Sequence, residues 1–135
     1  MAHYGLYADI KEGSITKHTE SLRKKITAVR DNISTTTEEL TDDVWKCTAK
    51  GTLLKAFTTI DTEVCEDISN KLDALDSIAG FIAAYKTAES DAKGIADQIK
   101  PSNTATQNST LEASLRIQEG LMDAAESSIN SLLKA

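Results

Sequence analysis

The chain has 135 residues and a formal net charge of −6, with 40% hydrophobic and only 4% aromatic side chains. The acidic balance argues against binding to a nucleic-acid backbone, which requires a basic footprint, and no stretch approaches the roughly 20 apolar residues of a membrane span. One proline and six glycines leave few breaks, so the composition favours long helices with narrow apolar stripes over a thick globular core.

The N-terminal stretch MAHYGLYADIKEG has no basic start followed by an apolar core, so we expect no cleaved signal peptide. A helical tract follows. Its strong apolar positions are separated by 7, 4, 3, 4 and 7 residues: Ile15, Leu22, Ile26, Val29, Ile33 and Leu40. This is a heptad stripe interrupted by Thr19 and Thr36, and it is typical of a helix that packs along a second helix.

A second, longer helix is predicted from about Thr48 to Ile99. Its apolar stripe comprises Leu53, Phe57, Ile60, Val64, Ile68, Leu72, Leu75, Ile78, Ile82 and Tyr85. An extra four-residue step around Ile68 is a stutter, which relaxes a supercoil locally. Gly80 is the candidate kink, and a compact folded-back bundle is the alternative to an unbroken helix.

The stretch KPSNTATQN (100–108) is predicted to be a linker, because Pro101 cannot continue a helix and the rest is small and polar. Ser109 and Glu112 have the spacing of a capping box, which predicts a third helix over 109–135. Its stripe alternates steps of four and three residues: Leu111, Leu115, Gln118, Met122, Ala125, Ile129 and Leu132.

In antiparallel helices, the position numbers of facing residues add to a constant. A constant near 90 pairs the first helix with the second, as in Ile26 with Val64, and sets Arg23, Lys24, Lys25 and Arg30 opposite Asp61, Glu63, Glu66 and Asp67. A constant near 210 pairs the third helix with the rear half of the second, as in Ala125 with Tyr85. The sequence therefore predicts an all-α fold: an antiparallel helical hairpin (1–99) with a long central helix, a linker (100–108) and a C-terminal helix (109–135) packing on the rear half.

The sequence offers little chemistry. Cys47 and Cys65 lie about 27 Å apart if both are on one helix, which is too far for a disulfide. Two cysteines and two distant histidines do not make a zinc site, and no catalytic motif occurs, so we expect no metal, no cofactor and no enzyme activity. Two-helix layers leave their apolar stripe open on one side, which predicts a helical partner or a second copy. The expected interface residues are Phe57, Ile60, Phe81 and Ile82.

Trp45 lies at the predicted corner of the hairpin, and Tyr85 and Glu89 lie one turn apart near the end of the second helix. A hairpin with a corner Trp followed by Y-x-x-x-D/E resembles the WXG family of small type VII secretion substrates. That resemblance implies a helical hairpin forming homo- or heterodimers, with Trp45, Tyr85 and Glu89 as export-signal residues. It further implies a cytoplasmic protein that leaves a Gram-positive cell, or reaches its surface, without a cleaved signal peptide.

The third position of the W-x-G motif is Cys47 here instead of Gly. The chain also continues well past the point at which members of that family usually end. The extended form is similar to the small helical partners of LXG-type toxins, which accompany the toxin to the secretion channel. The alternative is a structural coiled-coil subunit in which Trp45 and Tyr85 only pack.

Overall fold

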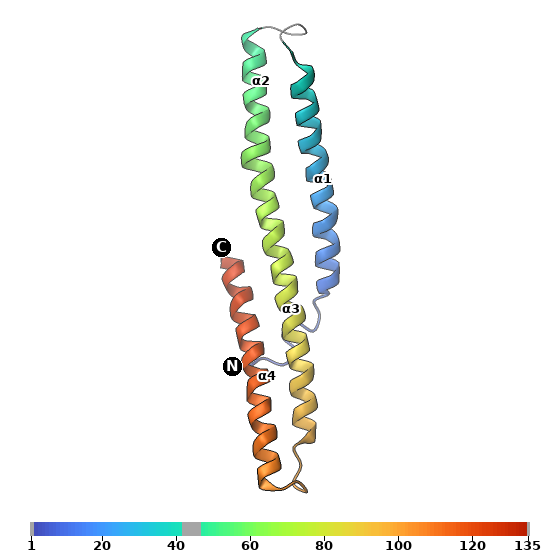
Figure 1. The fold of residues 1–135 in the computed structure, drawn as a ribbon, viewed down its shortest axis with the longest axis vertical. Coiled ribbons are helices and arrows are strands. Elements are labelled where there is room, and N and C mark those ends of the chain that lie inside the picture. The colour runs from blue at the N-terminus through green and yellow to red at the C-terminus, as the bar shows by residue number, and fades with distance from the viewer. Residues whose placement is uncertain (1, 42–46, 135) are drawn as a thin grey trace. The chain divides into compact units, whose positions relative to one another are not determined.

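A computed structural model describes residues 2–41 and 47–134 of the chain. Within these ranges the protein is all-α, and no strand occurs. The elements in chain order are α1 (Glu12–Glu39), α2 (Thr48–Thr59), the π-helical segment η1 (Ile60–Cys65), α3 (Glu66–Gln98) and α4 (Ala105–Lys134). The α-helices are labelled in Figure 1. The predicted fold class is confirmed, because a long central helix is preceded by one helix and followed by a C-terminal helix that packs against it.

The central helix runs from α2 through η1 into α3 with no intervening loop, and Gly80 lies inside α3 without interrupting it. The irregular turn is η1, one turn before the stutter predicted around Ile68. A π-helical turn closes its hydrogen bonds over five residues instead of four, so it accommodates an extra residue without ending the helix.

The start of α4 differs from the prediction. The helix begins at Ala105, not at Ser109, and the capping box is formed by Thr104 and Gln107. The Thr104 amide donates to Gln107 Oε1 (2.8 Å), and the Gln107 amide donates to Thr104 Oγ1 (3.1 Å). Asn103 Nδ2 donates to the Gln98 carbonyl at the end of α3 (2.8 Å), which closes the connection early. The earlier of two similar signatures is therefore the one that caps the helix.

The chain divides into two compact units, and each is described here by itself. The terminal unit comprises Met1–Ile15 and Ser77–Ala135, and the hairpin unit comprises Thr16–Asp76. The predicted boundary lay in the linker 100–108. The boundaries between the two units lie instead within α1, after Ile15, and within α3, after Asp76.

The core of the terminal unit lies between α3 and α4. One buried cluster joins Tyr85, Ala88 and Ala92 of α3 to Met122 and Ala125 of α4. A second joins Ile78 and Ile82 to Ile129, with Phe81 and Leu132 packed against it. These clusters contain the partners that the predicted register brings together, because small alanines on α3 leave room for Met122 and Ile129 of α4.

The seam of the hairpin unit is more polar than predicted. Thr19 is buried and its hydroxyl donates to Asp76, while Arg23 donates to Asp76 and, at 2.5 Å, to Asp73. Arg30 donates to Asp61 at 2.7 Å. The Arg30 pair agrees with the predicted register, but Arg23 binds beyond the predicted Asp67. The one extra residue held in η1 accounts for only part of this shift, which is six positions to Asp73 and nine to Asp76.

Several apolar residues predicted to fill this seam lie outside it. Between 39% and 48% of the surface of each remains exposed: Leu22, Val29, Ile60, Val64, Ile68 and Leu75. The prediction that Ile26 and Val64 face one another across the seam is therefore wrong at Val64, whereas Ile26 is half-buried. The polar side chains are long enough to cross between the helices and form the ion pairs, and the aliphatic residues beside them are displaced to one flank.

We expect the Asp76 carboxylate to make the hairpin unit sensitive to acid. The hydrogen bond from Thr19 and then that from Arg23 hold the pKa of Asp76 below its ordinary value of 3.8. A folded-state pKa below the unfolded one stabilises the fold above the unfolded value, and that stabilisation is lost as the pH falls through the folded-state pKa. We expect the free energy of unfolding in urea, followed by circular dichroism, to decrease below about pH 4, and less steeply in Asp76→Asn. Exposed Asp31→Asn is the control and should keep the wild-type profile. Identical profiles for Asp76→Asn and wild type would contradict this assignment.

The cap of α4 can be tested with a matched pair of substitutions. Thr104→Ala should lower the free energy of unfolding by about 1 kcal/mol, because the Gln107 amide loses its acceptor. Ser109→Ala lies inside α4 and should leave it unchanged or slightly raise it, since alanine is the better helix former. Urea unfolding measures both, and the reverse order would place the cap at Ser109 after all.

Candidate partner-binding interface

The three residues of the predicted export signal are placed differently. Trp45 lies outside the described residues. Tyr85 is completely buried, and Glu89 is 8% exposed. The predicted cover over Tyr85 was Ala125 of α4, and Ala125 does share its cluster. The sequence analysis missed a second cover, which comes from the other end of the chain.

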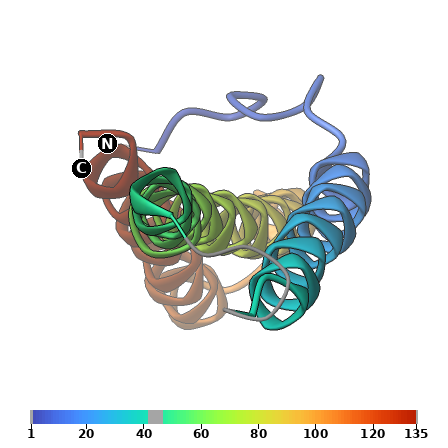
Figure 2. The same ribbon diagram turned by 90° about the horizontal axis from the view of Figure 1, so that it is seen from above.

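That cover is the N-terminal segment, residues 2–10, which crosses α3 as a non-helical chain (Figures 1 and 2). Three successive turns shape it, in which the amides of Leu6, Ala8 and Ile10 donate to carbonyls three residues earlier. Gly5 has a φ of 79°, a left-handed conformation that glycine adopts without the steric cost other residues incur.

Tyr85 and Glu89 hold this segment mainly through its backbone. The His3 amide donates to the Tyr85 hydroxyl at 2.9 Å, and that hydroxyl donates to the His3 carbonyl. The Gly5 amide donates to the Glu89 carboxylate. The Tyr7 ring meets the Tyr85 ring edge-on, with centroids 4.8 Å apart and planes at 90°. Such T-shaped pairs are favourable because the positive edge of one ring meets the negative face of the other.

Charged groups complete the contacts. Lys86 donates to the Ile10 carbonyl and pairs with Glu12 at 2.7 Å, and His3 Nδ1 lies 3.3 Å from Glu126 of α4. Burial raises the pKa of the Tyr85 phenol, although its hydrogen bond to His3 acts in the opposite direction. The motif Tyr85–Glu89 is therefore occupied by the chain itself. The sequence feature that could have indicated this N-terminal cover is YGLY (4–7), in which two tyrosines flank a glycine and a leucine ahead of the first helix.

The hairpin unit carries an apolar flank, formed by Leu22, Val29, Ile60, Val64, Ile68 and Leu75. Each of these residues directly precedes a buried or half-buried residue of the seam: Arg23, Arg30, Asp61, Cys65, Ser69 and Asp76. The residues that directly follow those of the seam within this unit are polar and exposed: Lys24, Asp31, Thr62, Glu66 and Asn70.

The six residues of the apolar flank share one side of the two-helix layer. Antiparallel helices in one layer are related by a two-fold axis perpendicular to that layer, so the residue before the seam points to the same side on both helices. The residue after the seam points to the opposite side. The hairpin unit is thus a layer with an apolar flank on one side and a polar flank on the other.

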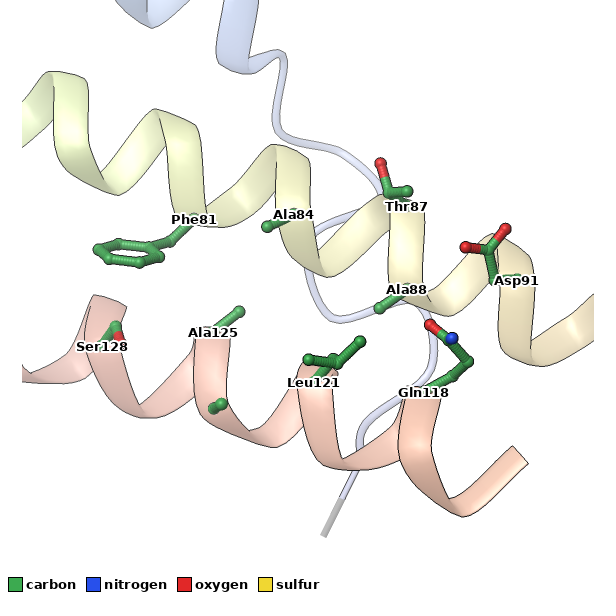
Figure 3. A pocket seen from close by; sticks show the side chains of 10 residues that line it. Phe81, Ala84, Thr87, Ala88, Asp91, Gln118, Leu121, Ala125 and Ser128 are labelled. Atoms are coloured by element: carbon green, nitrogen blue, oxygen red, sulfur yellow. The ribbon is translucent and has the colours of Figure 1, made fainter. Parts of the chain in front are cut away.

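The terminal unit has an open groove between α3 and α4, with a volume of about 550 Å³ (Figure 3). Figure 3 shows Phe81 and Leu121 facing the groove, with Gln118 and Asp91 at one end. Ala84 and Ala88 also line the groove, and their small side chains leave it open on the α3 side. At 100° per residue, Ala84 and Asp91 lie on the side of α3 away from Lys86 and Glu89, so this groove is separate from the place that the N-terminal segment occupies.

The four predicted interface residues have different surroundings. Ile60 belongs to the apolar flank and is 39% exposed. Phe57 is half-buried, and Phe81 is half-buried at the groove. Ile82 is 1% exposed inside the core of the terminal unit, and its role in a partner interface stays a prediction. Ile82 and Phe81 are adjacent in α3 and therefore point in different directions, which a shared apolar stripe does not reveal.

In the part of the chain that the structure describes, no three His, Cys, Asp or Glu side chains lie together as potential metal ligands. Likewise, none of the described helices is both long and apolar enough to cross a membrane. Comparisons with protein-family models, with curated proteins and with solved structures gave no match for this chain.

Proposed function

We propose that the chain is a non-enzymatic helical adaptor or substrate of a Gram-positive type VII secretion system. It pairs with itself or with a larger helical effector of the LXG type, and the pair presents Trp45, Tyr85 and Glu89 as an export signal. It is cytoplasmic until export and secreted or surface-bound afterwards. The observation that supports this proposal is the apolar flank of the hairpin unit.

The free energies favour a partner with an apolar helical face of its own. Covering the exposed half of one aliphatic side chain contributes roughly 1 kcal/mol, so the six residues of the flank contribute on the order of 6 kcal/mol. Association itself costs about 4–15 kcal/mol in lost translational and rotational freedom. When the flank packs against a polar surface, the free energy from its burial therefore only about offsets the cost of association. A partner with an apolar face of its own about doubles the favourable term.

A second candidate function is a structural coiled-coil subunit without a role in secretion. The observation that favours it is the burial of Tyr85 and Glu89, both of which are engaged by the N-terminal segment. In that case the two residues fasten the segment to α3, and the apolar flank joins the chain to an assembly.

Substitutions on the two flanks test the docking surface. Val64→Asp should leave the hairpin folded, because nearly half of the Val64 surface is exposed, but should lower association at least tenfold by placing a carboxylate in the apolar flank. Thr62→Asp introduces the same carboxylate on the polar flank of the same helix and should leave association unchanged.

The measurement is sedimentation equilibrium of the purified chain alone and mixed with the helical N-terminal domain of an LXG toxin from its own genome. Helicity by circular dichroism serves as the folding control for both variants. Equal association of Val64→Asp and the wild-type chain in both settings would contradict docking through this flank.

Export tests the role of the motif. Glu89→Gln preserves the size of the side chain and should abolish appearance of the chain, or of its LXG partner, in the culture medium of the native host. Asp91→Asn changes an exposed carboxylate two residues further along α3 and should be exported like wild type. Cells lacking the type VII ATPase give the background. Export of Glu89→Gln at the wild-type level would leave the structural subunit as the better account.

A further inference from the structure

The surface beneath the N-terminal segment has the properties of a peptide-binding site. Four of its hydrogen bonds go to main-chain groups: the Tyr85 hydroxyl binds the amide and the carbonyl of His3, Glu89 binds the Gly5 amide, and Lys86 binds the Ile10 carbonyl. Main-chain groups occur in every peptide, so these contacts provide affinity without depending on sequence.

Two features of the segment provide selectivity. Gly5 adopts a φ of 79°, and the Tyr7 ring packs edge-on against Tyr85. Most of the other side chains of the segment are exposed: His3, Tyr4, Leu6, Ala8, Asp9 and Ile10. The site therefore selects a turn in which a glycine stands two residues before a tyrosine.

The helices beneath the segment do not depend on it for their packing. Met122 and Ala125 of α4 are buried against α3, and Ile129 is buried against Ile78 and Ile82. Only Ala2 and Tyr7 of the segment add apolar side chains to these clusters. We expect that lifting the segment would break its hydrogen bonds, its contacts with Glu119 and Glu126 of α4 and the packing of Ala2 and Tyr7, while α3 and α4 remain paired.

We propose that the face of α3 and α4 around Tyr85 and Glu89 is a peptide-binding site, which residues 2–10 occupy in cis and which a Gly-x-Tyr turn segment of a second protein occupies in trans. The exchange is close to balanced because the incoming segment makes the same main-chain bonds that the outgoing one gives up. This site goes beyond the proposed function, because it gives Tyr85 and Glu89, the two residues assigned there to the export signal, a peptide-binding role that does not require export or the apolar flank.

The first experiment measures opening of the site in the full chain. Tetranitromethane nitrates exposed tyrosine rings, and peptide mapping distinguishes Tyr4, 45% exposed, from fully buried Tyr85. Gly5→Ala should raise the rate of Tyr85 nitration about tenfold, because a left-handed conformation is costly for alanine. A Cβ added at Gly5 meets no atom within 4 Å, so the effect arises from the backbone conformation and not from a clash.

Gly120→Ala is the matched control, since Gly120 lies within α4 and a Cβ there also meets no atom within 4 Å. Its nitration pattern should equal that of wild type. Gly5→Pro should open the site further, because proline has neither the required φ nor the amide that donates to Glu89. Equal protection of Tyr85 in Gly5→Ala, Gly5→Pro and wild type would overturn the proposal.

The second experiment supplies the segment in trans. The peptide AHYGLYADIK, labelled on its lysine, should bind saturably to full-length Gly5→Pro in fluorescence anisotropy and at least tenfold more weakly to wild type, whose site is occupied. Replacing the peptide glycine by L-alanine should weaken binding about tenfold, whereas D-alanine, which favours positive φ, should preserve it. Absence of saturable binding to Gly5→Pro, with Tyr85 open to nitration and helicity intact, would show that the segment is only a fixed part of the fold.

Discussion

Two helices cannot bury both sides of the seam between them, and the organisation of the hairpin unit follows from this constraint. Side chains that point directly across the seam are Thr19, Arg23, Arg30, Asp61 and Asp76, and they form hydrogen bonds and ion pairs. These contacts fix the register without requiring apolar residues between the helices. The aliphatic residues next to them are left exposed on one flank. The ion pairs of the hairpin and the docking surface proposed for it thus lie on different residues of the same helices.

The terminal unit meets the same constraint within a single chain. There α4 pairs with α3, and the N-terminal segment covers the side of α3 that carries Tyr85 and Glu89. Three layers of chain contribute, so the buried residues are mostly apolar, and Tyr85 can be buried completely because its hydroxyl is satisfied by the backbone of His3. The non-helical N-terminal segment therefore adds a third layer over α3, which the hairpin unit lacks.

Helix positions could be predicted from the sequence because apolar spacing and proline reflect local physics. The register of α4 on α3 was also predictable, since Met122 and Ile129 fit against alanines and isoleucines at matching spacing. The residues that line the seam of the hairpin unit could not be predicted in the same way. A heptad stripe identifies the face of a helix that packs on its partner only to within about one residue, and a shift of one residue places Arg23 instead of Leu22 in the seam. Ion pairs between long side chains decided that choice.

The N-terminal segment illustrates a second limit. Its bonds join His3 and Gly5 to residues more than 80 positions away, and most of them use the backbone, which leaves no trace in residue type. Of the features that hold the segment, only Gly5 at positive φ and Tyr7, two residues later, depend on residue type and are therefore visible in the sequence. Sites that bind main-chain groups are for this reason hard to find from sequence, whereas Tyr85 and Glu89 were found through their spacing on one helix face.

The π-helical turn Ile60–Cys65 has a further consequence for how this chain can change over evolutionary time. Residues of the central helix that face α1 recur every four positions at Phe57, Asp61, Cys65 and Ser69, a repeat longer than the about 3.6 residues of an α-helical turn. An unbroken α-helix would rotate such a repeat steadily away from its partner, and the wider turn rotates it back. Loss of one residue within 62–64 would convert the wider turn into an ordinary α-helical turn and change the repeat to steps of four, three and four, which keeps the residues beyond it in phase with α1. The hairpin unit should therefore tolerate the loss of one residue here, whereas the loss of a second would rotate the rest of the central helix by about 100° relative to α1.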